Sequence, residues 1–177
     1  NPYARKKLIN VINGKDGEFI SVIHKSSYIC ETAKIGMGVV IAAFSTISDN
    51  DKLGDYIFIN SMVAIGHDAM VGDYSCMMSH VNITGKCIVG KNTYWGSGSR
   101  ILPNGKVEDN AFIGAGSVVL KKVKTNKKVL GLILGGLMSI SLVGCSNTDK
   151  AEELILENVE NTLQANFHYA EKHTILP

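Results

Sequence analysis

Apolar side chains recur at every sixth position over a long central stretch of the chain. The run holds sixteen consecutive positions without a miss. A step of six residues matches neither the 3.6-residue period of a helix nor the period of two of an ordinary strand. The positions are Ile29, Ile35, Ile41, Ile47, Leu53, Ile59, Ile65, Val71, Met77, Ile83, Val89, Trp95, Ile101, Val107, Ile113 and Val119. A fixed period of this kind predicts a repeat architecture.

The other positions of this six-residue repeat are restricted too. The next residue is glycine in seven repeats, and the residue four later is small or β-branched in fifteen of sixteen, Asp51 being the exception. We expect each repeat to form one short strand and one bend, with the aliphatic side chain inside and glycine relieving the backbone at the bend. Three repeats would close one triangular coil, which predicts about five coils of an all-β parallel β-helix.

A β-sandwich whose strands happen to match this period is the alternative. Sandwich strands alternate with a period of two, and their irregular loops reset the phase. The β-helix therefore fits the pattern better. The period alone does not determine the hand of the winding.

Charge and cysteine content narrow the classes of partner and site. The net charge is +2, and no long basic stripe is present, so we expect no nucleic-acid partner. The four cysteines show no CxxC spacing, which argues against a zinc knot or a disulfide framework. Reduced thiols fit a cytoplasmic location.

Residues 127–145 differ in character from the repeats. Two lysines precede an apolar run that ends in small residues and Cys145, which is the layout of a secretory signal. The ending Leu142-Val143-Gly144-Cys145 resembles a bacterial lipoprotein lipobox, and the run is shorter than the ~20 residues of a transmembrane helix. Three interpretations stay open: a reading frame that joins two genes, a buried or interfacial helix, and a membrane contact through residues 129–145.

Beyond this segment, residues 151–173 carry apolar side chains at steps of three and four. Leu156, Val159, Leu163 and Phe167 belong to this set. Such spacing predicts an amphipathic helix. We therefore divide the chain after residue 20 into β-helix coils over 21–124, an apolar signal-like segment over 125–146 and a helical tail over 147–177.

Three stretches of the repeat region carry a more specific pattern: residues 58–75 (FINSMVAIGHDAMVGDYS), 83–103 (ITGKCIVGKNTYWGSGSRILP) and 107–123 (VEDNAFIGAGSVVLKKV). These stretches resemble the NeuD-type sugar O-acyltransferases, a group of hexapeptide-repeat acetyltransferases. The resemblance extends over about residues 1–131. It implies a left-handed parallel β-helix in a trimeric, LpxA-like assembly, with acetyl-CoA as co-substrate and no metal.

The resemblance also implies roles for individual residues. His67 matches the general base, which removes a proton from the attacking amine or hydroxyl, and Asp68 matches the acid that orients its ring. Adjacent side chains point to opposite faces of a strand, so this pairing requires a bend at His67. Asn60 matches a substrate-binding position. Ser97 and Ala115 match cofactor-contacting positions.

Two further positions are less well matched. Cys76 stands where the family often has a histidine close to the thioester, so it is a cofactor-binding candidate, and a small core residue is its other interpretation. His80 is a weaker candidate, four residues later. Lys121 or Lys122 would meet the phosphates of coenzyme A.

Both ends of the repeat region depart from the family. Residues 1–20 resemble only the end of its small nucleotide-binding domain, so we expect them to be a remnant of that domain. The family's terminal motif is replaced here from about Gly131 by the signal-like run.

The predicted function is acetyl-CoA-dependent transfer of an acetyl group to an amino or hydroxyl group of a bacterial sugar or nucleotide sugar, by a homotrimer. A truncated or chimeric product, in which the β-helix is only an oligomerisation scaffold, is the alternative. A γ-class carbonic anhydrase shares the solenoid but needs a close set of zinc-binding histidines. Only His24, His67 and His80 lie in or near the coils, so we expect no metal site.

Overall fold

A computed structural model describes residues 2–13 and 19–130 of the chain. The segment expected as a signal-like run and the tail expected as an amphipathic helix lie outside these residues from 131 onward. No helix in the described part is long and apolar enough to cross a membrane.

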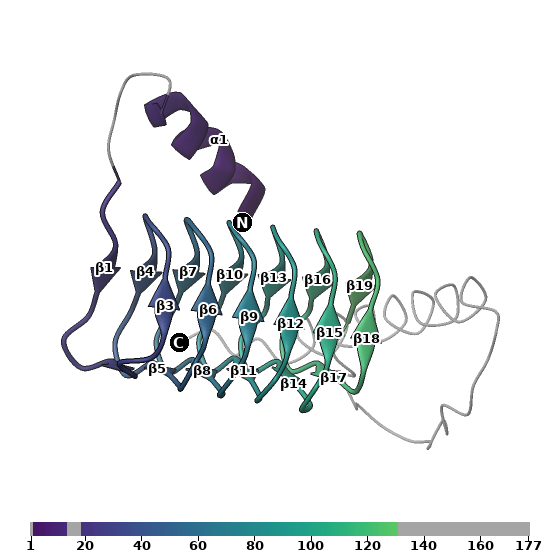
Figure 1. Cartoon of the computed structure of the whole chain (residues 1–177). Coiled ribbons are helices and arrows are strands. Elements are labelled where there is room, and N and C mark those ends of the chain that lie inside the picture. Colours follow the sequence, from purple (N-terminus) through teal and green to yellow (C-terminus); the bar gives the residue numbers. More distant parts are fainter. Residues whose placement is uncertain (1, 14–18, 131–177) are drawn as a thin grey trace, which may run out of the picture. The chain divides into compact units, whose positions relative to one another are not determined.

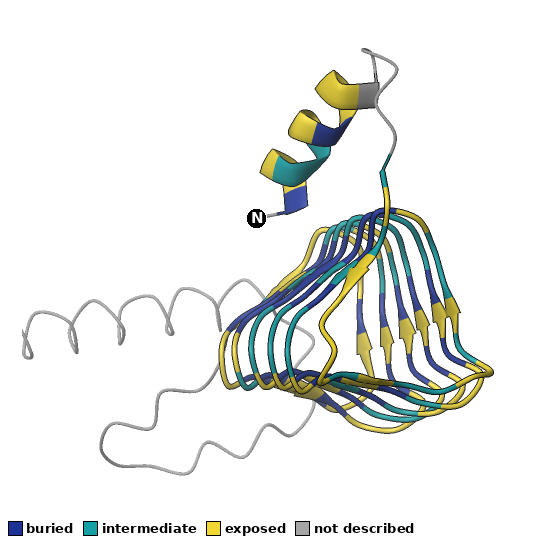
Figure 2. Ribbon diagram, turned by 90° about the vertical axis from the view of Figure 1, so that its left-hand side faces the viewer, coloured by how far each residue is buried: buried dark blue, intermediate teal, exposed yellow. Residues whose placement is uncertain are grey.

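The described chain winds into a triangular parallel β-helix with one two-residue strand on each side of every coil (Figure 1, Figure 2). Sheet A holds β1 (Val22–Ile23), β4 (Val40–Ile41), β7 (Phe58–Ile59), β10 (Cys76–Met77), β13 (Tyr94–Trp95), β16 (Phe112–Ile113) and β19 (Lys128–Val129). Sheet B holds β2 (Tyr28–Ile29), β5 (Thr46–Ile47), β8 (Ala64–Ile65), β11 (Asn82–Ile83), β14 (Arg100–Ile101) and β17 (Val118–Val119). Sheet C holds β3 (Lys34–Ile35), β6 (Lys52–Leu53), β9 (Met70–Val71), β12 (Ile88–Val89), β15 (Lys106–Val107) and β18 (Lys122–Val123). We name each corner by the two sheets it joins.

The six-residue period produces this register directly. Strands pair in parallel with residues one coil away, so that Ile65 lies beside Ile47 and Ile83. From β4 to β18 the second residue of each strand is buried, and these side chains form a continuous core that includes Trp95. Each buried aliphatic contributes about 1.5–3 kcal/mol relative to full exposure.

The coil count exceeds the expected five. The structure has about six turns, because the coils begin at β1 and continue through β18 and β19. The last turn does not follow the six-residue period, because the step from Val119 to Val123 is four residues. Val123 nevertheless pairs with Val107 in the usual register. The coils therefore also pass the expected boundary at residue 124.

The sequence predicts that the glycines after the inward positions form the bends, and this prediction is wrong. The left-handed backbone conformation falls two residues later, at positions such as Asn50, Tyr56 and Asp68, with φ near 60°. Gly66 is needed instead for close stacking. A Cβ atom there would lie 2.8 Å from the backbone nitrogen of Gly85 in the next coil.

Helix α1 (Pro2–Asn13) packs on sheet A of the early coils (Figure 1). The Arg5 guanidinium donates to the Tyr56 carbonyl at 2.9 Å and lies 5.5 Å from the Phe58 ring centroid. Lys6 Nζ lies 5.0 Å from the ring centroid of Tyr74. Cation–π contacts and one charge-assisted hydrogen bond thus attach the helix to the coils.

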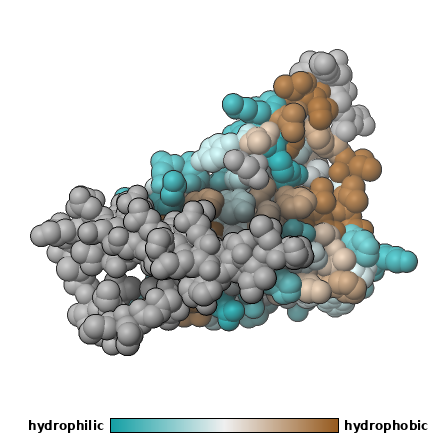
Figure 3. All heavy atoms as spheres, turned by 180° about the vertical axis from the view of Figure 1, so that it is seen from behind, coloured by the Kyte–Doolittle hydropathy of each residue, from teal (hydrophilic) through white to brown (hydrophobic). Residues whose placement is uncertain are grey.

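The outer side of α1 remains apolar. Leu8, Val11 and Ile12 are exposed, and Ile20 just beyond the helix is exposed as well. Figure 3 shows apolar residues gathered over the helix and the first coils. Ile9, on the inner side, is buried.

Candidate active site

His67 and Asp68 are the two turn residues between β8 and β9, at the B–C corner. His67 Nδ1 lies 2.8 Å from Asp68 Oδ2. Asp68 has a φ of 58°, and this left-handed conformation lets its side chain turn back toward the neighbouring imidazole. The corner thus supplies the bend that pairing of adjacent residues requires.

The pair is open to solvent and electrostatically coupled. The His67 and Asp68 side chains are 59% and 43% exposed. The hydrogen bond from His67 lowers the pKa of Asp68, and an Asn50 Nδ2 donor at 3.3 Å acts in the same direction. A carboxylate on Nδ1 favours the tautomer with its proton there, which leaves a lone pair on Nε2. No residue that the structure describes donates a hydrogen bond to Nε2, so this atom can accept a proton from a ligand.

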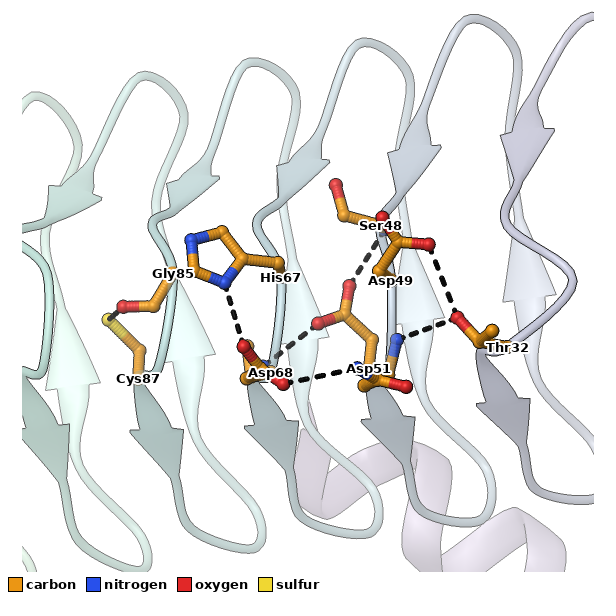
Figure 4. A network of polar contacts seen from close by, with 10 residues as sticks. Thr32, Ser48, Asp49, Asp51, His67, Asp68, Gly85 and Cys87 are labelled. Carbon is orange, nitrogen blue, oxygen red and sulfur yellow. Dashed lines mark hydrogen bonds and ion pairs between the residues drawn. The ribbon is translucent and has the colours of Figure 1, made fainter.

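Gly85 forms the floor under the imidazole (Figure 4). A Cβ atom at this position would lie 2.6 Å from His67 Nε2 and 2.9 Å from Cδ2. Gly85 was not among the residues expected at the site. Its signal was present, because Gly85 follows His67 by one coil of eighteen residues and is the only glycine at that position of the sixteen repeats.

The preceding coil holds this corner through three consecutive residues. The backbone carbonyl of Asp49 accepts from Asp68 N at 2.8 Å, and the side chain of Asn50 donates to Asp68. Asp51 is 0% exposed, and its two carboxylate oxygens accept from Ala69 N at 2.9 Å and from Ser48 N at 2.8 Å. Burial raises the pKa of Asp51. The sequence marked Asp51 as an exception to the repeat but gave it no role.

Asn60, Ser97 and Ala115 lie on a different edge of the coils, the A–B corner. Asn60 Oδ1 accepts from the backbone nitrogen of Ser61 at 2.8 Å. Ser97 and Ala115 are exposed, and their N–H groups donate to no acceptor among the described residues. The adjoining turn glycines would meet nothing within 4 Å of an added Cβ. This part of the A–B corner is therefore open backbone with unused donors.

The structure does not bring the remaining candidates to either place. Cys76 faces α1 from β10, is 0% exposed, and has the Arg5 guanidinium 4.0 Å from its sulfur. His80 is an exposed turn residue of the A–B corner. Lys122 pairs with Glu108 at 2.7 Å, which lowers the pKa of Glu108 to about 2.

The histidines of the coils do not converge on a metal. His24 and His80 belong to the A–B corner, whereas His67 belongs to the B–C corner. Over residues 2–13 and 19–130, no three histidine, cysteine, aspartate or glutamate side chains lie close enough to hold a metal ion.

Neither a protein-family model nor a curated protein sequence matches the chain. Solved structures do match. The acetyltransferase domain of PglB from Neisseria gonorrhoeae FA1090 is 20% identical with a TM-score of 0.72, covering 74% of this chain and 64% of that chain. PerB from Caulobacter crescentus, in complex with CoA and GDP-perosamine, is 24% identical with a TM-score of 0.71, covering 73% and 62%. WeeI from Acinetobacter baumannii AYE is 24% identical with a TM-score of 0.71, covering 74% and 64%.

At these identities the likeness concerns the fold. The predicted left-handed parallel β-helix of hexapeptide repeats is confirmed. The chain spans less than two thirds of the length of these solved structures.

Proposed function

We propose that the chain is an acetyl-CoA-dependent acetyltransferase that acts on an amino or hydroxyl group of a sugar or nucleotide sugar. The observation that carries this proposal is the His67–Asp68 pair, which has a 2.8 Å hydrogen bond and an exposed imidazole whose Nε2 bonds to no residue that the structure describes. Solved neighbours include a perosamine N-acetyltransferase in complex with CoA and an acetyltransferase domain in complex with acetyl coenzyme A. They support the same class of reaction for this chain.

The geometry suits proton removal during acetyl transfer. The acceptor's nitrogen or oxygen attacks the thioester carbonyl, and its proton moves to His67 Nε2. Asp68 holds the Nδ1 proton and stabilises the imidazolium that forms. Collapse of the tetrahedral intermediate releases the coenzyme A thiolate, which takes up a proton, and leaves the acetylated sugar.

We further propose that the complete site forms between copies of the chain in a homotrimer. His67 and the open backbone near Ser97 and Ala115 lie on different corners, separated by one side of the triangle. A base on one protomer and amide donors on its neighbour would then face the same thioester. Unpaired N–H groups can stabilise the oxyanion of a tetrahedral intermediate.

Thiol release from acetyl-CoA in the presence of a nucleotide-linked 4-amino-sugar tests the reaction. With the full chain, we expect His67→Ala to lower kcat/KM by about 10²–10⁴-fold, the usual contribution of a general base. His24→Ala is the matched control, since that exposed ring hydrogen-bonds to Ser26 and to no other residue in the described part of the chain. Full activity in His67→Ala would contradict the assignment. No thiol release by the wild-type chain with any amino- or hydroxyl-bearing sugar would favour the oligomerisation scaffold instead.

A further inference from the structure

The outer face of sheet C carries lysine on four of its six strands. The first residue of each of these strands is exposed, and along the sheet these residues are Lys34, Lys52, Met70, Ile88, Lys106 and Lys122. At the same position, sheets A and B hold one basic residue each, Lys128 and Arg100. Sheet C is therefore the basic face of the coils.

The four lysines form two pairs in different surroundings. Lys34 lies in register with Lys52, and Lys106 lies in register with Lys122. Neighbouring strands are about 4.8 Å apart, and like charges directly opposite each other are unfavourable. Glu108 offsets the second pair, because it lies 2.7 Å from Lys122. No carboxylate in the described part of the chain forms an ion pair with Lys34 or Lys52.

The acids around the Lys34–Lys52 pair have other partners. The Asp49 carboxylate accepts from Thr32 Oγ1 at 3.3 Å. Asp51 is buried and accepts from two backbone nitrogens. Asp68 bonds to His67. A negative charge that neutralises the lysine pair would therefore come from a ligand.

One pocket connects this lysine pair to the candidate base. It has a volume of about 330 Å³ and is lined by Thr32, Lys34, Asn50, Lys52, Asp68 and Met70. Asp68 holds the imidazole of His67, so the pocket extends from the two lysines to the side of the base. Met70 is 47% exposed and adds an apolar surface. The volume falls within the range of small-molecule sites.

We propose that Lys34 and Lys52 bind a phosphate group of a ligand whose other end reaches His67. A lysine ammonium binds phosphate as a point charge, and a phosphate between the two side chains would relieve their mutual repulsion. This inference rests on the proposed function and deepens it. The phosphate belongs either to the sugar acceptor or to coenzyme A, and the assay below distinguishes these two sources.

Binding of inorganic pyrophosphate to the full chain, measured by isothermal titration calorimetry at low salt, tests the site without catalysis. The wild-type chain should bind saturably, and Lys52→Gln should weaken this binding about tenfold through loss of one charge-assisted contact. Lys106→Gln is the matched control, because it removes the same charge from the same exposed position of sheet C. Lys106→Gln should bind as the wild type does. Both variants change an exposed side chain, so their melting temperatures should stay close to the wild-type value.

The thiol-release assay identifies the source of the phosphate. If it belongs to the acceptor, Lys52→Gln should raise KM for the nucleotide-linked 4-amino-sugar about tenfold and leave kcat and the KM for acetyl-CoA unchanged. If it belongs to coenzyme A, the KM for acetyl-CoA should rise instead. Added salt should reduce either difference, because it screens exposed charges.

Three results would overturn the inference: no pyrophosphate binding by the wild-type chain, equal weakening in Lys52→Gln and Lys106→Gln, or an active Lys52→Gln variant with both KM values unchanged. The calorimetry is independent of turnover. Pyrophosphate binding that is weakened only in Lys52→Gln, in a chain that releases no thiol, would uphold the phosphate site while refuting the acetyltransferase proposal.

Discussion

The A–B and B–C corners have similar backbone turns but differ in the groups that they present. Between residues 44 and 104, both corners turn through a residue with φ near 60° in every coil. At the B–C corner, Asp51, His67 and Asp68 form bonds across coils and within the turn. At the A–B corner of later coils, Gly98 and Gly116 leave bare backbone with open space around it. The backbone geometry thus repeats along the solenoid, and the choice of residues decides whether a corner carries a histidine–aspartate pair or presents open backbone.

Mixing two inactive variants tests whether one active site combines the B–C corner of one protomer with the A–B corner of its neighbour, and it should give the largest effect. His67→Ala removes the proposed base, and Ser97→Trp blocks the open backbone of the other corner. If the site joins two protomers of a trimer, subunits that are unfolded and refolded together should regain about a quarter of wild-type activity, because about one interface in four pairs two intact corners. Thiol release after refolding, with each variant refolded alone as control, measures this recovery. No recovery in mixed trimers would place the whole site within one protomer.

The floor of the B–C corner gives a smaller effect. Gly85→Ala would push a methyl group against His67 Nε2, so we expect kcat to fall about tenfold or more from displacement of the base. The imidazole is exposed and can swing away, so the melting temperature should change little.

Gly72→Ala is the matched control for Gly85→Ala. A Cβ atom on Gly72 would lie 2.7 Å from backbone atoms of Gly90 and Lys91, and the imidazole is not among its nearest neighbours. Backbone atoms cannot move aside as a flexible side chain can. We expect a loss of about 2 kcal/mol in stability with kcat preserved below the melting temperature. If both variants lose activity and stability together, Gly85 is only a stacking glycine.

At the third corner, C–A, the pH dependence of folding stability tests the contribution of one ion pair. Lys122 lowers the pKa of Glu108 to about 2, below its ordinary value of 4.5. A depressed pKa means that the ionised form stabilises the fold, so this contribution is complete above pH 4.5 and is lost as the pH falls toward 2. Thermal melts between pH 7 and pH 2.5 should show a larger acid destabilisation for wild type than for Glu108→Gln. Equal acid sensitivity would show that the last coil does not depend on this ion pair.

The sequence predicted correctly those features that depend on the position of a residue within the repeat. The inward-facing positions from Ile29 to Val119 could be identified because the position in the six-residue repeat decides whether a side chain faces the core or the solvent. The extra coil was missed because β18 follows a four-residue step that breaks the period while preserving the pairing. The stacking role of Gly66 was missed because its contact, Gly85, is distant along the chain.

The residues of the candidate site also fall into two groups, those that the sequence identified and those that only the structure identified. His67 and Asp68 could be named from sequence because they are adjacent and share one turn. Asp51 and Gly85 lie about one coil before and after them, and only stacking of the coils brings Asp51 to Ala69 and Gly85 to the imidazole. Cys76 was a cofactor candidate by resemblance, and only the packing of α1 shows that the helix covers it.

The sequence by itself therefore determined the repeat, the direction of each side chain and the adjacent pair of His67 and Asp68, because these depend on local periodicity and on hydrophobic burial. The tertiary structure decided which corners face the same way, which residues lie over the imidazole and which lie under the helix. Those properties follow from contacts about eighteen residues apart or more, and no local pattern encodes them.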